Sequence, residues 1–265
     1  MEPPPGTSKE FLAVRHSVLN GNTYDIEKLV EDTLCLERYT PGRKVVPCFE
    51  GDLLQVRETG EAILTHQNFF PLSQERYRDL KERKLAASLK EVLDKIAAFR
   101  QKNSDQKVVL CFEPKSITRE ATIKETVRWL KEYGISQAYF DSFFGGKLDM
   151  VASANKDHET NYARSLHLIG NLFAAHLMMD RPREGYDLLT VPHALSLGEV
   201  GESVIYGAVG STEILERVAE NPQARGAYVR LEEGAGIRGA AIKLWNSVTN
   251  TEKLRRTHLS EFSLP

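Results

Sequence analysis

Two short runs of the chain read Cys-Phe-Glu and carry a second charged residue at the same spacing. The runs end in Glu50 and Glu113, and each follows an apolar stretch of the kind that forms a strand. A second charge follows two residues later, Asp52 in the first run and Lys115 in the second. Because side chains alternate faces along a strand, the two charged side chains of each run point the same way. We therefore expect all four to gather at one end of a sheet.

Three carboxylates packed together repel one another, and this raises their pKa values unless positive charge compensates. The ammonium group of Lys115 supplies one charge, and a hard divalent cation such as Mg²⁺ or Ca²⁺ would supply two more through oxygen ligands. For any single carboxylate, a solvated strand end paired with arginine is an equally good explanation. Taken together on neighbouring apolar strands, Glu50, Asp52 and Glu113 favour a metal site.

Two histidines follow predicted extended segments near the same region. His16 ends the first predicted strand, and His66 ends the return arm of a predicted hairpin. Two imidazoles on opposite sides of a reacting group can act as acid and base, because their ordinary pKa lies near neutrality. We predict that these two form an acid–base pair. His193 is a weaker candidate, and the remaining histidines are expected to be structural: His158, His167, His176 and His258.

The elements that must position these residues alternate regularly between strands and helices. Strands rich in β-branched and aromatic residues are predicted at 11–16, 45–54, 107–115, 137–143, 165–171, 187–193, 203–210 and 226–231. This alternation predicts a parallel sheet with helices outside it. At 265 residues, closure into a (β/α)8 TIM barrel is expected, with its active site at the carboxyl ends of the strands. Residues 1–9 are predicted to be a flexible arm, and 10–265 a single barrel domain.

Helical periodicity predicts helices at 25–38, 118–133, 211–220 and 237–248, and two helices within 73–102. Residues 145–163 and 195–202 are ambiguous. A turn signal at Glu58-Thr59-Gly60 between two extended stretches predicts a hairpin over 56–66. The first strand is followed by no Gly-x-Gly-x-x-Gly, which argues against a dinucleotide-binding fold.

Composition excludes some classes of protein and favours others. The 35 basic and 37 acidic residues leave a net charge of -2, which argues against a nucleic-acid partner. No apolar run approaches the ~18 residues of a membrane-spanning helix, so no transmembrane segment is expected. The N-terminus does not resemble a signal peptide, and the low cysteine count fits a reducing compartment, so a cytoplasmic location is expected. Cys48 and Cys111 lie in apolar runs and are expected to be buried. The oligomeric state is left open.

In their order along the chain, these residues resemble the glycerophosphodiester phosphodiesterases, within the wider phospholipase C-like barrel superfamily. That family's pattern runs His-Arg-Gly, Glu-Asn-Thr, Glu-x-Asp, a Thr-x-Asp-Gly turn, His-Asp and Glu-x-Lys. The corresponding segments here are His16-Ser17-Val18, Gly21-Asn22-Thr23, Glu50-Gly51-Asp52, Glu58-Thr59-Gly60, His66-Gln67 and Glu113-Pro114-Lys115. The third and last match fully, and the matched motifs span under half of the chain.

The resemblance implies a role for each matched residue. Glu50, Asp52 and Glu113 would bind a divalent metal, Mg²⁺ or Ca²⁺. His16 and His66 would be the acid–base pair, and Lys115 would help to hold the phosphate of a small-molecule or lipid-derived phosphodiester.

The chain departs from the family at the residue after the first histidine, where Ser17 stands in place of a phosphate-contacting arginine. Arg15 precedes His16 instead, and on a strand the two would point to opposite faces.

Two other functions remain open at this point. Sphingomyelinase D-type barrels use a similar arrangement of two histidines and Glu-x-Asp, so the chain resembles these lipid phosphodiesterases or lyases as well. The apolar pairs Phe69-Phe70 and Phe143-Phe144 would suit a lipid-facing rim, although ordinary packing under the loops is the favoured interpretation of both. The missing arginine leaves a third alternative, a non-catalytic barrel that binds a phosphorylated ligand.

Overall fold

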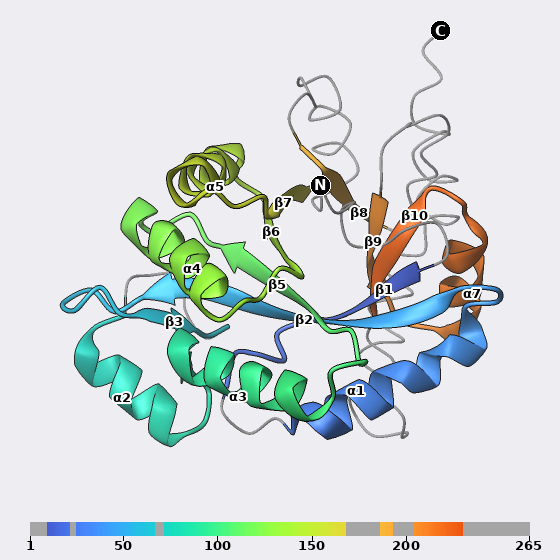
Figure 1. Cartoon of the computed structure of the whole chain (residues 1–265), viewed down its shortest axis with the longest axis horizontal. Coiled ribbons are helices and arrows are strands. Elements are labelled where there is room, and N and C mark those ends of the chain that lie inside the picture. The colour runs from blue at the N-terminus through green and yellow to red at the C-terminus, as the bar shows by residue number, and fades with distance from the viewer. Residues whose placement is uncertain (1–9, 22–24, 67–71, 168–185, 193–203, 230–265) are drawn as a thin grey trace, which may run out of the picture.

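The structure is a computed structural model that describes residues 10–21, 25–66, 72–167, 186–192 and 204–229, drawn in colour in Figure 1. Within these residues, eight parallel strands form a closed barrel. They are β1 (Glu10–Arg15), β2 (Lys44–Gln55), β5 (Val109–Pro114), β6 (Ala138–Ser142), β7 (Ala163–His167), β8 (Leu188–Pro192), β9 (Val204–Val209) and β10 (Ala224–Val229). Their order is β1-β10-β9-β8-β7-β6-β5-β2, and pairing of β1 with β2 closes the ring. The predicted (β/α)8 TIM barrel is confirmed.

In the part of the chain that the structure describes, the helices between barrel strands lie on the outside of the barrel (Figure 1). The described helices of this layer are α1 (Ile26–Leu34), α3 (Leu89–Lys102), α4 (Glu120–Glu132), α5 (Gly145–His158) and α7 (Thr212–Glu220), and a 3-10 turn, η1 (Cys35–Tyr39), follows α1. Side-chain caps start α1 and α7, where Asp25 and Ser211 accept hydrogen bonds from backbone N–H groups of the first turn. The ambiguous stretch 145–163 contains α5 and the first residue of β7. The segments 195–202 and 237–248 lie outside the described residues.

A small extension grows from the carboxyl end of β2. It consists of β3 (Ala62–Leu64), which pairs antiparallel with β2, of α2 (Gln74–Glu82) and of β4 (Ala87–Ser88), which pairs with β3. Gly60 adopts a φ of 75° in the connecting turn, a left-handed conformation that suits glycine. The predicted hairpin and the two helices within 73–102 are confirmed, whereas β4 between those helices was not predicted.

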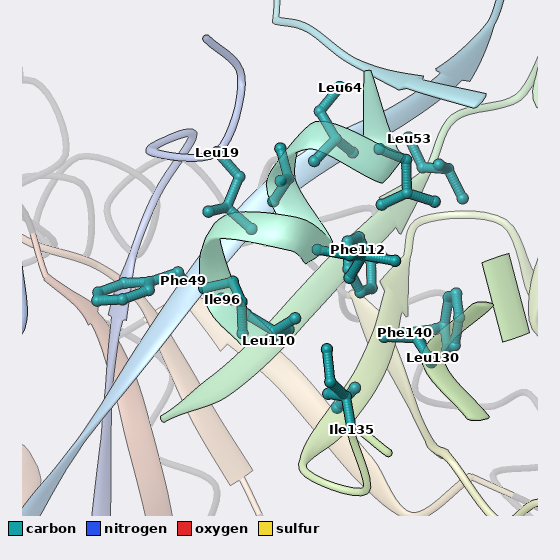
Figure 2. Packing of buried hydrophobic residues seen from close by; sticks show 14 of the residues in the cluster. Leu19, Phe49, Leu53, Leu64, Ile96, Leu110, Phe112, Leu130, Ile135 and Phe140 are labelled. Carbon is teal, nitrogen blue, oxygen red and sulfur yellow. The ribbon is translucent and has the colours of Figure 1, made fainter. Parts of the chain in front are cut away.

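The strands bury side chains on both faces. Side chains that point outward from β2, β5 and β6 pack under the helices, where Phe49, Phe112 and Phe140 share one buried cluster with Ile96 of α3 and Leu130 of α4 (Figure 2). Side chains of the opposite phase fill the barrel interior: Leu12, Val14, Val46, Cys48, Val109, Cys111, Tyr139, Ala163, Leu188, Ile205 and Tyr228. Burial of Cys48 and Cys111 agrees with the prediction. The apolar layer closes the barrel below the carboxyl ends of the strands, so that end, here called the mouth, is where polar groups can meet a ligand.

The division of the chain into an arm and one domain stays a prediction, because residues 1–9 and 230–265 lie outside the described residues.

No helix in the described part of the chain is long and apolar enough to cross a membrane. The expected cytoplasmic location is a separate prediction.

Candidate active site

The inward-facing residues of β2 and β5 are apolar within the barrel and charged at the mouth. On β2 the inward residues after Cys48 are Glu50 and Asp52, and on β5 the inward residue after Cys111 is Glu113. The two strands pair in parallel with Asp52 opposite Glu113, and all three carboxylates are buried. The period of two that packs the barrel core therefore also aims the three acids at one place.

The three predicted metal ligands form a compact cluster. Glu50, Asp52 and Glu113 each offer a carboxylate oxygen, and these oxygens all lie within 4.8 Å of one another. Lys115 contacts Asp52 Oδ1, and its Nζ lies 2.6 Å from Glu113 Oε1. Glu50 Oε2 accepts a hydrogen bond from the backbone N–H of Ser17, whereas its buried Oε1 has no hydrogen-bond partner in the described part of the chain. The cluster thus contains an oxygen that still needs a positive partner.

The pKa values of the cluster report its charge balance. Burial raises the pKa of Glu50 well above its ordinary value, and the neighbouring charges of Asp52 and Glu113 add to the rise. Burial also raises the pKa of Glu113, although Lys115 opposes it. Asp52 differs, because the hydrogen bond with His66 and the charge of Lys115 outweigh the effect of burial and lower its pKa. One ammonium group therefore does not compensate three buried carboxylates.

The two predicted catalytic histidines lie beside this cluster. His16 follows β1 and His66 follows β3, and their ring centroids are 5.2 Å apart with the planes nearly perpendicular. Ser17 Oγ lies between the rings, 3.0 Å from His16 Nδ1 and 3.3 Å from His66 Nδ1. Two segments that are fifty residues apart in sequence thus bring two imidazoles to the same side of the mouth.

His66 is held in place by Asp52. Its Nδ1 lies 2.6 Å from Asp52 Oδ2, and this hydrogen bond raises the pKa of the imidazole. The preceding residue, Thr65, donates its backbone N–H to the carbonyl of Asp52 and its hydroxyl to the carbonyl of Leu85. The hairpin therefore brings the chain back to Asp52 near the end of β2. This explains why His66, which lies outside the barrel strands, reaches the site.

Asn20 is a site residue that sequence reasoning missed. Its Nδ2 donates to Asp52 Oδ2 at 2.6 Å, and its Oδ1 accepts from the backbone N–H of Asp52 at 2.8 Å. These two bonds fix the orientation of the carboxylate. The motif comparison pointed instead to Asn22, which lies outside the described residues together with Thr23, Gln67 and His193. A possible signal was the position of Asn20, only four residues after His16 in the same short loop.

A second polar group faces the mouth from β6, β7 and β10. His167, which was expected to be structural, ends β7 and is buried with its Nδ1 2.8 Å from Asp141 Oδ2. Tyr228 donates its hydroxyl hydrogen to the same carboxylate oxygen at 2.7 Å. The ring of Phe143 stacks on the imidazole at a centroid distance of 4.1 Å. The signal for this group was strand phase, since Asp141 follows the inward-facing Tyr139 by two residues.

The two residues that flank His16, Arg15 and Ser17, point in different directions. Ser17 adopts a φ of 58°, a left-handed conformation that few residues other than glycine occupy, and this turn points its N–H at Glu50. Burial lowers the pKa of Arg15, and the charge of Asp32 on α1 opposes the change. Arg15 therefore lies on the helix side of the barrel wall, as expected from its strand phase, and not in the mouth.

The apolar pair after β6 differs from the favoured interpretation. Phe143 and Phe144 are 39% and 46% exposed, so the packing of this pair under the loops was wrongly predicted. Phe143 stacks on one face of the buried His167 ring while its own side chain stays partly exposed. Phe69 and Phe70 lie outside the described residues.

No family model and no curated protein match the chain. Among solved structures, it is similar to a glycerophosphodiester phosphodiesterase from Parabacteroides distasonis, with a TM-score of 0.50 and 12% sequence identity, over 84% of this chain and 94% of that chain. At this identity the likeness shows the barrel fold, in agreement with the strand order described above.

Proposed function

We propose that this chain is a metal-dependent phosphodiesterase that hydrolyses a glycerophosphodiester-like substrate. One observation carries the proposal: three buried carboxylates with oxygens within 4.8 Å of one another lie beside two imidazoles whose centroids are 5.2 Å apart. The solved phosphodiesterase with a similar fold supports the proposal at a coarse level. The chemistry itself rests on the side chains of this chain.

The donor set fits a hard divalent cation. Glu50, Asp52 and Glu113 would hold Mg²⁺ or Ca²⁺, because these ions prefer oxygen ligands. Sites of this kind often combine carboxylate oxygens with oxygens of a substrate phosphate. Three carboxylates and one ammonium leave two negative charges, and Glu50 Oε1, which has no hydrogen-bond partner among the described residues, is available as a ligand atom. A bound cation would supply charge neutralisation at the phosphate oxygens. Lys115 is the nearby ammonium group for a further contact to the phosphate.

The two histidines are proposed to move protons in opposite directions. The bond with Asp52 raises the pKa of His66, so this ring holds its proton to a higher pH than an ordinary imidazole does and suits the general acid. His16 then takes a proton from the attacking water as its oxygen bonds to phosphorus. His66 gives its proton to the alcohol oxygen as the bond from phosphorus to that oxygen breaks. The products are an alcohol and a phosphate monoester.

The test is an assay of purified protein with glycerophosphodiesters and a chromogenic phosphodiester, in Mg²⁺, in Ca²⁺ and with excess chelator. Turnover is expected with one of the metals and not with chelator. His16→Ala and His66→Ala are each expected to lose activity by about 10²–10⁴-fold, the usual contribution of an acid or base. His158→Ala, on a histidine of the last turn of α5, is the matched control and should retain activity. Full activity in chelator, or in either site variant, would defeat the proposal.

A second function is favoured by the exposed pair Phe143 and Phe144 beside the mouth. Such a rim suits an acyl chain, as a sphingomyelinase D-type lipid phosphodiesterase or lyase would require. A cyclic phosphate released from a choline lipid would identify this activity. Phosphate binding without turnover of any substrate would instead identify a non-catalytic barrel, the alternative motivated by Ser17 in place of an arginine.

A further inference from the structure

Asp141 of β6, His167 of β7 and Tyr228 of β10 form a polar group in the mouth that the proposed chemistry does not use. In the ring of eight strands, β7 is four strands from β1 in either direction, so His167 faces His16 across the mouth. Tyr228 lies between them, with its ring centroid 5.8 Å from that of His167 and 6.2 Å from that of His16. The influence of His167 also reaches Glu113, since it opposes the rise in pKa that burial causes there. His167 therefore faces the same mouth as the candidate active site.

The orientation of the His167 ring is fixed on three sides. Asp141 lies 2.8 Å from Nδ1 in an ion-pair arrangement, off the line of a straight hydrogen bond, and Phe143 stacks on one face with an interplanar angle of 18°. The ring of Tyr228 lies beside the imidazole with an interplanar angle of 40°, and the tyrosine hydroxyl donates to Asp141. Few rotations of the ring satisfy all three neighbours, so the direction of its second nitrogen is set before any ligand arrives.

That second nitrogen, Nε2, is buried and has no hydrogen-bond partner in the described part of the chain. A buried polar atom without a partner costs free energy, and a ligand atom that completes it gains a correspondingly strong bond. Because Nδ1 faces a carboxylate, Nε2 points away from Asp141. With a hydrogen on Nε2, the ring donates to an acceptor in the mouth. The ligand that fits is an anion with an exposed oxygen.

We infer that His167 is a further substrate-binding residue, which donates from Nε2 to a phosphate oxygen and is oriented by Asp141 as a positioning residue. The substrate would then be contacted by the acidic and metal-binding side of the mouth and by His167 from the opposite side. This inference rests on the proposed function. It assigns the phosphate, and not the leaving alcohol, to the space between β5 and β7.

The first experiment follows the ring nitrogens of His167 by NMR in ¹⁵N-labelled protein as inorganic phosphate is added in the presence of Mg²⁺. His167→Gln identifies the resonances by their loss. The Nε2 resonance of His167 is expected to shift on phosphate addition, while those of His158 do not. Saturable phosphate binding without any change at Nε2 would overturn the inference.

The second experiment uses two variants that separate the two ring nitrogens. In His167→Asn the amide nitrogen replaces Nδ1, so Asp141 keeps a donor and the mouth loses one. In His167→Gln the amide nitrogen replaces Nε2 and the donor to the mouth is kept. The Kd for phosphate and the KM for the phosphodiester are expected to rise about 10–100-fold in the Asn variant, as for a lost charge-assisted bond, and less in the Gln variant. His158→Asn is the control.

The outcomes distinguish the two proposals. If the wild-type protein neither binds phosphate nor hydrolyses any phosphodiester, the proposed function fails and this inference fails with it. If the wild type is active and His167→Asn, folded by circular dichroism, binds phosphate as tightly as the wild type, only the assignment of His167 fails.

Discussion

Two pairs of an aspartate and a histidine face the same mouth, and they are built differently. In the first, Asp52 and His66 are 2.6 Å apart, and the histidine side chain is 53% exposed on a loop outside the barrel. In the second, Asp141 and His167 are 2.8 Å apart, and the histidine side chain is 7% exposed at the end of a barrel strand. The aspartate is fully buried in both pairs.

The surroundings of the two carboxylates differ more than the pairs themselves. Asp52 is contacted by Asn20, Lys115 and His66, and of these His66 and Lys115 hold its pKa below the ordinary value against the effect of burial. Among the described residues, Asp141 accepts one hydrogen bond, from Tyr228, in addition to its contact with His167. An exposed imidazole on a strongly held carboxylate can exchange protons with solvent between turnovers. A buried imidazole fixed by packing is better suited to orient a ligand.

The largest difference is expected when each aspartate loses its charge. Asp52→Asn removes a proposed metal ligand and the partner of the acid–base histidine, so kcat/KM should fall by about 10⁴-fold or more. Asp141→Asn keeps the size of the side chain and should reduce kcat/KM by only about tenfold, mainly through KM. Steady-state kinetics on the phosphodiester measures both. Equal losses in the two variants would remove the distinction between the pairs.

The next effect is on His66 and on the pH dependence of activity. His66→Ala should lower kcat by about 10³-fold. In the wild type the raised pKa of His66 means that the general acid is protonated below that pKa and is lost as pH rises through it, so activity should decline on an alkaline limb that lies above pH 6.5. His66→Ala should lack this limb, whereas Asp141→Asn should keep it at the same pH. A limb at or below pH 6.5 would contradict the assignment.

A smaller effect is expected from Asn20, which exists only in the first pair. Asn20→Ala removes both bonds that orient Asp52 and should reduce activity or metal affinity by about 10–100-fold, as is usual for groups that orient a ligand residue. Asn103→Ala is a matched control, because that amide bonds the carbonyl of Phe99 at the end of α3. Metal titration by calorimetry measures the effect. If the two variants bind metal equally, Asn20 does not position the carboxylate.

The smallest expected effect is on stability in the absence of substrate. The pKa of Glu50 is raised in the folded state, so without metal the folded protein holds a proton that the unfolded chain releases above about pH 4.3. Stability should therefore fall as pH rises from there through the raised pKa. A metal at a hundredfold excess over its Kd adds about 2.7 kcal/mol. The increase in Tm on adding Mg²⁺ or Ca²⁺ should grow between pH 5 and pH 8, as measured by scanning fluorimetry. The increase should vanish in Glu50→Gln.

Much of the fold could be predicted because each barrel strand has a recognisable local sequence pattern. All eight parallel strands lie within a few residues of the predicted ranges, since apolar β-branched runs bounded by turns are local features. The hairpin after β2 was readable for the same reason. The short strand β4 was not, because its two residues pair only with β3 and have no pattern of their own.

The candidate site was readable where strand phase and residue type agreed. Glu50, Asp52 and Glu113 were predicted to converge from their alternation along apolar strands, and their oxygens lie together in the structure. Asn20 and His167 were missed for different reasons. An asparagine in a loop has no periodicity that predicts its direction, and a single histidine at a strand end is more often structural than functional.

Which residues point into the barrel follows from the amino-acid sequence, because an alternation of two residues is a property of each strand alone. This alternation was the basis for predicting the three acids, and it also places Asp141 and His167 on the inward-facing side. Which of these inward-facing groups meet depends on the folded barrel, since the closure of the ring and the register of its strands bring β7 opposite β1 and Asp52 opposite Glu113. Distances between side chains on strands that are far apart in the sequence depend on that closure, and no local pattern encodes them.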